Sequence, residues 1–439
     1  MIVASSVNVF AGEHPINLKG RTPALMSKRM SNQSSDHESW IDRDGKTVFL
    51  EKTVRTIPYG FLGVIFGVYL AQLGFGAFAI GIVLTATVLS SAFYTFIVSF
   101  LADRIGRRRT LIFFALTDCV AGFLLFLSTA WWAPVLAGIV GNMTVGAGEV
   151  GPFLSLEQAI LPKTCSSSRR TLAFSVYNLV GYGASSIGAL VAGLPQYFGP
   201  NLTGYRPLFL VYMISGLLGA FLYSTMSKKV EVERAIERKH TALSPKAKPI
   251  VFKLSALFSI DAFGGGFIGQ SILSYYFYTR FALDLSTLGE IFFATQIVTA
   301  LSFLLAERIS RRIGLLRTMV FSHIPSNVFL TAVPFAPTPL SAVFLLLCRH
   351  SLSQMDVPAR QSYVMAVVDE SDRTAAAGLT SATRTVSSSI SPSIAGYAIE
   401  AIWVGAPLVA AGILKLTYDF LIYTTFRKVK PPEEIRVKS

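Results

Sequence analysis

The stretch SFLADRIGRRRTLIF, residues 99 to 113, places an acid, a glycine and a run of arginines between two strongly apolar segments. Of the 439 residues in the chain, 52% are hydrophobic and only 15% are charged, and this composition is typical of membrane proteins. A helix needs roughly 20 apolar residues to cross hydrocarbon about 30 Å thick. We therefore interpret the stretch as a short loop between two transmembrane helices.

Apolar runs long enough to cross a membrane recur along nearly the whole chain. Open strands cannot satisfy their backbone groups in lipid, and a barrel would show short alternating segments, so the runs predict helices. The sequence predicts twelve spans, at residues 57–73, 79–101, 110–127, 133–160, 172–198, 207–226, 252–279, 285–306, 316–336, 339–368, 374–399 and 403–426.

Basic residues are distributed very unevenly between the predicted loops. If the N-terminus is inside, nearly all of the 39 Lys and Arg fall in inner segments, and Arg206 and Arg280 alone fall in outer loops. This is the positive-inside pattern, which predicts a multi-pass protein of the cell membrane with both termini in the cytoplasm. Contact with anionic lipid accounts for the net charge of +14, so we expect no nucleic-acid partner.

The three cysteines, at positions 119, 165 and 348, indicate neither a disulfide framework nor a metal site. Residues 1–54 are polar and rich in Ser and basic residues, which predicts a disordered cytoplasmic tail. Residues 227–251 form a second polar, basic stretch that divides the spans into six and six, and residues 428–439 form a short C-terminal tail. We interpret residues 227–251 as a cytoplasmic linker.

The two groups of six spans share an internal repeat. LADRIGRRR begins at residue 101, and LAERISRRI begins 204 residues later, at residue 305. RRTLAFSVYNLVGYGASSIGALVAG, from Arg169, corresponds to DRTAAAGLTSATRTVSSSISPSIAG, from Asp372. Between them, GEVGPFLSLEQ corresponds to MDVPARQ, which pairs Glu149 with Asp356. We therefore expect two six-helix bundles, residues 55–226 and 252–427, related by a pseudo-twofold axis.

The motif Asp-Arg-x-Gly-Arg-Arg-Arg between the second and third of twelve spans, with a weaker copy between the eighth and ninth, resembles the major facilitator superfamily. The resemblance covers residues 55 to 426. It implies alternating access, with the two bundles rocking around a site near the bilayer midplane. It also implies that the first, fourth, seventh and tenth helices line the cavity.

By this resemblance the loop acts as a conformational latch. Asp103 is expected to accept hydrogen bonds from the inner end of a helix of the opposite bundle, and Gly106 to permit its close approach. Arg104 and Arg107 are expected to pair with acids and lipid phosphates. The second copy keeps Glu307 and Arg308 but has serine in place of the glycine. We also expect Glu157 and Arg360, which are repeat equivalents of opposite charge, to bridge the bundles and close an inner gate in the outward-open state.

Charged residues inside the spans are the candidates for substrate and proton binding, because each costs about 2.5–3.5 kcal/mol at the helix centre. Glu149 and Asp356 form a symmetric pair of acids, for which a proton or substrate role and a structural ion pair are both open. Arg349 and His350 could meet an anion or relay a proton. Asn142 stands where many proton-coupled exporters of this superfamily have arginine, which weakens the exporter interpretation.

The remaining intramembrane charges predict local ion pairs or ligand contacts. Arg384 is either an anion ligand or the partner of Asp356 or Asp261. Asp261 precedes three glycines that would let the seventh span bend or pack closely. Lys415 and Asp419 are four residues apart, which predicts a local ion pair, and Arg360 could neutralise Asp356 in the same way. Arg55, at the inner end of the first span, is expected to extend toward the headgroups.

We expect a secondary active transporter of a small organic solute, coupled to protons, with efflux slightly favoured. The alternatives are uptake or exchange of an organic anion, and an uncoupled facilitator or solute sensor. An enzyme is not expected, because the sequence contains neither a Walker loop nor a Ser/His/Asp set. We expect no cofactor and no metal ion. The expected partners are a small-molecule substrate, protons and membrane lipid, and the expected oligomeric state is a monomer.

Overall fold

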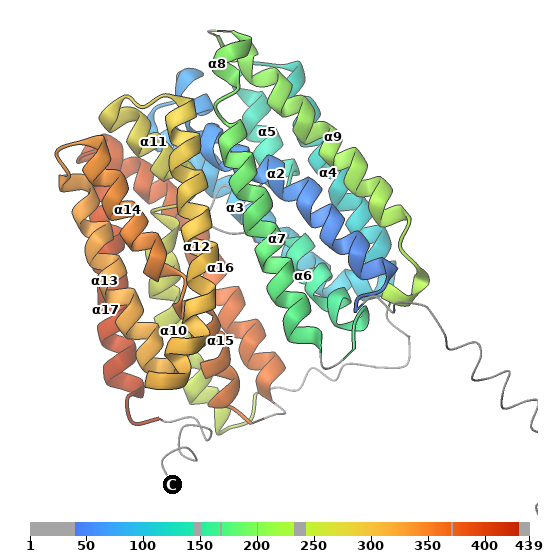
Figure 1. Cartoon of the computed structure of the whole chain (residues 1–439), viewed down its shortest axis with the longest axis vertical. Helices are drawn as coiled ribbons and strands as arrows, with labels where there is room; N and C mark the ends of the chain where they lie inside the picture. Colours follow the sequence, from blue (N-terminus) through green and yellow to red (C-terminus); the bar gives the residue numbers. More distant parts are fainter. Residues whose placement is uncertain are drawn as a thin grey trace, which may run out of the picture. The chain divides into compact units, whose positions relative to one another are not determined.

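The computed structural model describes residues 40–143, 151–166, 169–199, 201–231, 243–369 and 372–429, and most of these residues are helical (Figure 1). We call residues up to 231 the N-terminal half and residues from 243 the C-terminal half. Each predicted span coincides with one helix or with two helices in series. The chain is therefore an all-α membrane protein with the predicted architecture of twelve spans in two six-helix bundles.

The N-terminal half contains six spans. Its helices are α2 (Arg43–Gln72), α3 (Ala77–Ile105), α4 (Arg107–Leu127), α5 (Trp132–Val140), α6 (Pro152–Ile160), α7 (Arg170–Val191), the short α8 (Pro195–Phe198) and α9 (Arg206–Ser224). α5 and α6 together make the fourth span.

The C-terminal half repeats this arrangement. Its helices are α10 (Ala247–Gly266), α11 (Gln270–Phe281), α12 (Leu285–Ile313), α13 (Leu315–Ala332), α14 (Pro339–Ser353), α15 (Asp356–Ala366), α16 (Arg373–Ala401) and α17 (Ala406–Phe426). α10 and α11 make the seventh span, and α14 and α15 make the tenth.

Three spans are interrupted, and the local sequence explains where. Pro152 is the first residue of α6, and Pro358 lies in the first turn of α15, where a missing backbone N–H costs nothing. Gly151, just before α6, has a φ of +127°, which favours glycine. α10 ends at Gly266, the last of its three glycines. The interruptions place non-helical backbone in the middle of the fourth, seventh and tenth spans.

Within the described residues, seven helices or helix pairs are long and apolar enough to cross a membrane by length and composition. α7, α13 and α16 do not meet that criterion, and neither do the interrupted spans α5/α6 and α14/α15. Interrupted and polar helices are tolerated at membrane depth where they are buried in protein or line a cavity. The helices that depart from simple hydropathy are thus of special interest for function.

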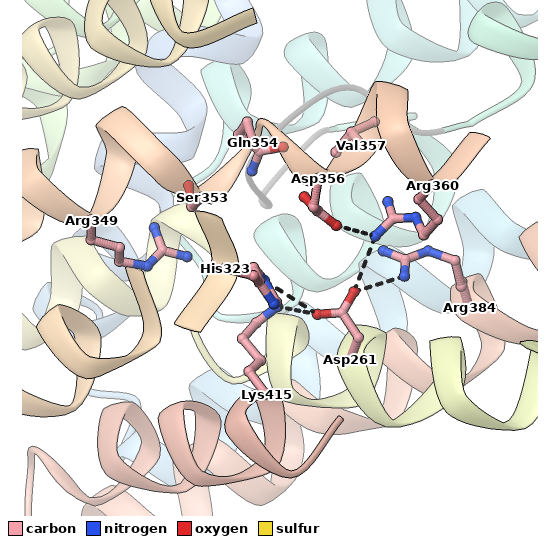
Figure 2. Close-up of a pocket in the computed structure, with 10 residues that line it drawn as sticks. All are labelled: Asp261, His323, Arg349, Ser353, Gln354, Asp356, Val357, Arg360, Arg384 and Lys415. Carbon is pink, nitrogen blue, oxygen red and sulfur yellow. Dashed lines mark hydrogen bonds and ion pairs between the residues drawn. The ribbon is translucent and has the colours of Figure 1, made fainter. Parts of the chain in front are cut away.

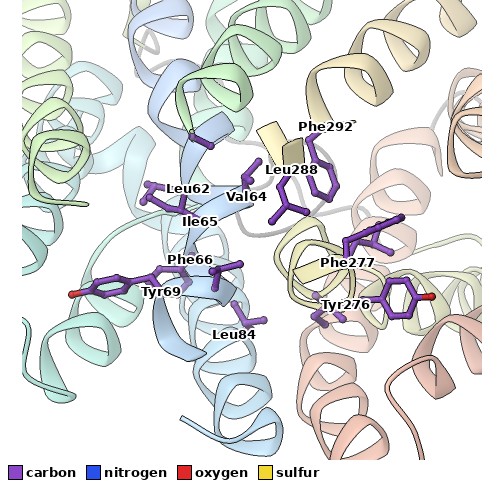
Figure 3. Close-up of a cluster of buried hydrophobic side chains, with 14 of the residues drawn as sticks. Leu62, Val64, Ile65, Phe66, Tyr69, Leu84, Tyr276, Phe277, Leu288 and Phe292 are labelled. Atoms are coloured by element: carbon purple, nitrogen blue, oxygen red, sulfur yellow. The ribbon is translucent and has the colours of Figure 1, made fainter. Parts of the chain in front are cut away.

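The two halves pack together at one end. Ser271 Oγ and Ser274 Oγ of α11 donate hydrogen bonds of 2.9 and 2.6 Å to the backbone oxygens of Gly63 and Val64 on α2. Here the apolar side chains of α2, α3, α11 and α12 form one continuous core (Figure 3). Two further cores, toward the opposite end, belong to the N-terminal and the C-terminal half separately.

Two helix crossings complete this contact between the halves. A Cβ atom on Gly396 of α16 would lie 2.3 Å from the backbone oxygen of Ala77, at the start of α3. A Cβ atom on Gly289 of α12 would lie 2.5 Å from the backbone oxygen of Ala189, near the end of α7. Only glycine permits such close backbone approach. By the predicted topology this closed end faces outward.

The first helix begins earlier than the sequence predicts. α2 starts at Arg43, inside the segment expected to be a tail up to residue 54. Its polar residues are paired: the carboxylate of Asp44 accepts a hydrogen bond of 2.9 Å from the Ser227 backbone N–H, and Asp42 caps the helix by accepting from Gly45 N at 2.8 Å. Residues 1–39 lie outside the described part of the chain.

Candidate functional site

A buried carboxylate organises the candidate site in the C-terminal half. Asp261 of α10 is 2% exposed. Its Oδ1 accepts from Lys415 Nζ of α17 at 2.6 Å, and its Oδ2 accepts from Arg384 Nη1 of α16 at 2.7 Å (Figure 2). His323 Nε2 of α13 lies 3.7 Å from Oδ1. One negative charge therefore holds together side chains from four helices that are far apart in the sequence.

Arg360 of α15 connects this carboxylate to a second one. Its Nη1 lies 2.6 Å from Asp356 Oδ2, four residues earlier on the same helix, and 3.3 Å from Asp261 Oδ2. Arg360 is thus shared between the two acids, and the carboxylate of Asp356 is engaged in an ion pair. Arg384 pairs with Asp261 rather than with Asp356.

The predicted ion pair between Lys415 and Asp419 is wrong. Lys415 reaches across to Asp261, whereas Asp419 accepts from Asn327 Nδ2 at 2.9 Å and lies 2.8 Å from His323 Nδ1. The spacing of four residues puts the two side chains within reach of each other, but both lie against neighbouring helices that offer buried partners. His323, which is not among the predicted site residues, links the carboxylates of Asp261 and Asp419.

Arg349 of α14 differs from the other cations of the site. It is 6% exposed, and its Nη1 lies 3.0 Å from His350 Nε2. Among the described residues no carboxylate lies within 4 Å of its guanidinium, and Nε has no hydrogen-bond partner. His350 Nδ1 in turn lies 3.1 Å from Thr299 Oγ1. A buried guanidinium without a carboxylate is costly unless another anion binds there.

These side chains line one pocket, into which Arg349 extends (Figure 2). The ionisable lining residues, apart from His323, are four cations and two carboxylates: Arg349, Arg360, Arg384, Lys415, Asp261 and Asp356. The pocket therefore has an excess of positive charge. The Arg384 side chain is 27% exposed and is the most accessible of the paired cations.

Asn142, a predicted site residue of the fourth span, lies outside this pocket. Asn142 donates its backbone N–H to Asp118 Oδ1 at 2.8 Å and its Nδ2 to Thr117 Oγ1 at 3.2 Å, so it belongs to the N-terminal half. Asp118 also accepts from the hydroxyls of Tyr59 and Tyr212, at 2.8 and 3.0 Å. Glu149 lies outside the described residues.

The structure does not bring Glu157 and Arg360 together, and the inner gate that they are expected to form in the outward-open state stays a prediction. Glu157 of α6 accepts from Arg55 Nη2 at 2.7 Å and from the Tyr177 hydroxyl at 2.6 Å, within its own half. Arg55 is 2% exposed and therefore does not extend toward the headgroups. Repeat equivalence identified two positions of opposite charge, but each finds its partners in its own bundle.

The loop from residue 103 to 109 is held by a carboxylate from its own half. Glu231 accepts from the backbone N–H groups of Arg107 and Arg108, at 2.6 and 3.3 Å, at the start of α4. Gly106 has a φ of +108°, and a Cβ there would lie 3.0 Å from Glu231 Oε1. In this structure Glu231, a residue of the same half, lies against Gly106, and the expected approach of a helix of the opposite bundle stays a prediction.

The structure describes the side chains of only some of the other predicted latch residues. Arg107 Nη1 donates to the backbone oxygen of Ala159 at 3.1 Å, so Arg107 contacts protein. Arg104 and Arg308 are exposed. The side chains of Asp103 and Glu307 lie outside the described part, so their latch role stays a prediction.

Comparison with known proteins identifies a family and a fold. Residues 53–354 match the family described as the Major Facilitator Superfamily. A Saccharomyces cerevisiae protein, described as the uncharacterized membrane protein YJR124C, is 24% identical to this chain over 422 residues, which cover 88% of this chain and 94% of the yeast protein.

Solved transporters have the same fold. The nucleoside transporter NupG matches with a TM-score of 0.67 and 17% identity, covering 88% of this chain and 99% of that one. The human organic anion transporter MFSD10 (TETRAN) matches with a TM-score of 0.61 and 14% identity, covering 87% and 99%. At these identities the likeness shows the fold alone.

Proposed function

Because this chain belongs to the Major Facilitator Superfamily, we propose that it is a proton-coupled secondary transporter that carries a small organic anion between the two faces of a membrane. The expected placement is the cell membrane with both termini in the cytoplasm, and the expected working unit is a monomer. Efflux, the direction that the sequence slightly favours, remains a prediction.

The observation that carries the choice of an anion is Arg349. The interior of a membrane protein penalises an ionised group that has no partner of opposite charge. Arg349 is buried, lines the pocket and has no carboxylate within 4 Å among the described residues. A carboxylate or phosphate group of a substrate would supply the missing charge through a bidentate hydrogen bond.

The neighbouring ion pairs support this proposal. Asp261 takes one hydrogen bond each from Arg384 and Lys415, so a substrate anion could displace it from Arg384 and leave it paired with Lys415. The cations would then keep a counter-ion whether the pocket is empty or filled. Such exchange of partners lowers the cost of keeping four cations in one buried pocket.

The proposal is tested by replacing Arg349. Binding of organic mono- and dicarboxylates, sugar phosphates, neutral sugars and nucleosides would be measured as the rise in Tm of purified protein, and active compounds by uptake into proteoliposomes. We expect a member of the anionic set to bind. Arg349→Gln should weaken its binding at least about 10-fold, since a charge-assisted hydrogen bond contributes about 1.5–3 kcal/mol, and Arg349→Lys should weaken it less.

The matched control is Arg317→Gln, which removes an exposed arginine from α13 of the same half and should leave binding unchanged. The choice of an anion is wrong if the neutral solutes bind and the anions do not, or if Arg349→Gln binds the anion as wild type does. An imposed pH gradient separates coupled transport from an uncoupled facilitator, because a facilitator's flux does not respond to it.

A further inference from the structure

A second buried cluster of ionisable groups lies in the N-terminal half, away from the pocket. Glu51 of α2, Glu157 of α6 and Tyr223 of α9 are at most 1% exposed. The Tyr223 hydroxyl oxygen lies 2.6 Å from Glu51 Oε2 and 2.7 Å from Glu157 Oε1. A single phenol oxygen thus bridges two carboxyl groups.

The two hydrogen bonds of this bridge require two protons, and the tyrosine hydroxyl supplies one of them. A tyrosine hydroxyl has one proton to donate, and an ionised carboxylate can only accept. Tyr223 can therefore donate to one of the two acids, and the other O···O contact is a hydrogen bond only if that acid carries a proton. Without that proton, the lone pairs of the phenol oxygen would face a carboxylate oxygen at hydrogen-bond distance in a buried place.

The other contacts indicate which acid carries the proton. Glu157 Oε2 already accepts two hydrogen bonds, from Arg55 Nη2 at 2.7 Å and from the Tyr177 hydroxyl at 2.6 Å. Glu51 has a longer contact with the same guanidinium, since Arg55 Nε lies 3.0 and 3.1 Å from its two oxygens. The ordered chain is thus Glu51 donating to Tyr223, and Tyr223 donating to Glu157.

The charges around the cluster are consistent with one bound proton. Lys52, also on α2, donates to the Tyr177 hydroxyl at 3.0 Å. On α4, Asp118 accepts from Tyr59, whose ring lies under the Arg55 guanidinium at 5.9 Å. If Glu51 is protonated, the two cations Lys52 and Arg55 are balanced by the two carboxylates of Glu157 and Asp118.

We propose that Glu51, Tyr223 and Glu157 form a buried proton-binding site that holds one proton and releases it during the transport cycle. Its role in coupling rests on the proposed function, whereas its occupancy by a proton does not. Loss of the proton leaves two negative carboxylates on either side of Tyr223. Their repulsion would push α6, the inner part of the interrupted fourth span, away from α2.

The experiment measures the proton without measuring transport. Infrared spectra of the full chain in proteoliposomes, free of substrate, would be recorded from acidic to alkaline pH. Wild type should show the C=O stretching band of a protonated carboxyl at neutral pH, which disappears at alkaline pH. Glu51→Gln should abolish this band. Tyr223→Phe should shift the pH of its disappearance, because the relay between the acids is lost.

Asp44→Asn is the matched control, since it removes another buried carboxylate of α2, one that accepts from the Ser227 backbone N–H, and it should leave the band in place. The proposal is overturned if wild type lacks the band, if folded Glu51→Gln retains it, or if Asp44→Asn removes it. If Glu51→Gln does not fold, Glu157→Gln replaces it, and this variant should shift or remove the band; an unchanged band overturns the proposal.

The two proposals can fail separately. If Glu51→Gln abolishes the band, the proton site is supported. If anion flux in the same protein does not respond to the pH gradient, proton-coupled transport is contradicted. Proton-driven anion flux in a protein that lacks the band supports the proposed function and overturns this site.

Discussion

At the scale of the residue, buried ionisable side chains in both halves meet partners from other helices. Asp261 contacts cations from α15, α16 and α17, and Glu157 contacts α2, α7 and α9. A buried ion pair adds little net stability, but removing one partner leaves the other charge without compensation. The two clusters are therefore sensitive to single substitutions.

Asp261→Asn should strongly destabilise the protein. The amide cannot neutralise Lys415 and Arg384, and loss of one partner of a buried ion pair costs about 3–5 kcal/mol. The measurement is the Tm of the purified protein in detergent. Glu290→Gln, which changes an exposed acid on α12, should shift stability by less than about 0.5 kcal/mol. Equal Tm values for the two variants would show that Asp261 is not the centre of the cluster.

The sequence could nominate these residues but not their pairings. Charged side chains in apolar runs are visible in the sequence, and Asp261, Asp356, Arg349 and Arg384 were selected in that way. Spacing of four residues correctly indicates that Arg360 can reach Asp356, yet the same rule fails for Lys415 and Asp419. Spacing measures reach along one helix, whereas the partner depends on which helices are neighbours.

At the scale of the element, the interrupted spans and the glycine crossings are the features that separate this chain from a set of simple apolar helices. The three glycines before α11 have both expected effects: α10 ends there, and a Cβ on Gly266 would lie 2.5 Å from the backbone oxygen of Ser388 on α16. Pro152 and Pro358 lie in the first turns of α6 and α15. They start new helices, because a proline fits the first turn.

Gly396→Val should weaken the contact between α3 and α16. Its Cβ would lie 2.3 Å from the backbone oxygen of Ala77, and overpacking of this kind costs about 1–3 kcal/mol. The closed end should open more often, by a factor of roughly 5 to 150. The measurement is the labelling rate of Ser393→Cys, beside this crossing, by a membrane-impermeant maleimide in a cysteine-free background.

The control for this substitution is on the same helix. A Cβ on Gly378 of α16 would meet nothing within 4 Å, so Gly378→Val should leave the labelling rate unchanged. A labelling rate that is the same for Gly396→Val and Gly378→Val would contradict a role of the crossing in closing this end.

At the scale of the whole molecule, the two halves contact each other through α2, α3 and α7 on one side and α11, α12 and α16 on the other. The hydrogen bonds of Ser271, Ser274 and Ser393 and the close glycine contacts gather at one end. Among the described residues, those that line the pocket with Arg349 all belong to the C-terminal half. Alternating access requires these contacts to break and re-form in each cycle.

The loop around Asp103 is predicted to control the change between the two conformations of the alternating-access cycle. Asp103→Asn should slow turnover and change substrate affinity little, because a latch stabilises one state without touching the substrate. The measurement is the initial rate of transport in proteoliposomes as a function of substrate concentration. Arg109→Gln, an exposed residue of the same loop, serves as the control. Unchanged turnover in Asp103→Asn would count against the latch.

The sequence by itself determined the membrane class, the twelve spans, the internal duplication and the residues whose charge is unusual inside a membrane. These features depend on local composition and on repetition along the chain, which need no knowledge of contacts. The tertiary structure alone decided that Lys415 and Arg384 share Asp261, that no carboxylate of the described residues lies beside Arg349, and that Tyr223 bridges Glu51 and Glu157. Such pairings depend on how helices distant in the sequence come side by side, because a buried charge binds whichever partner the packing brings within reach.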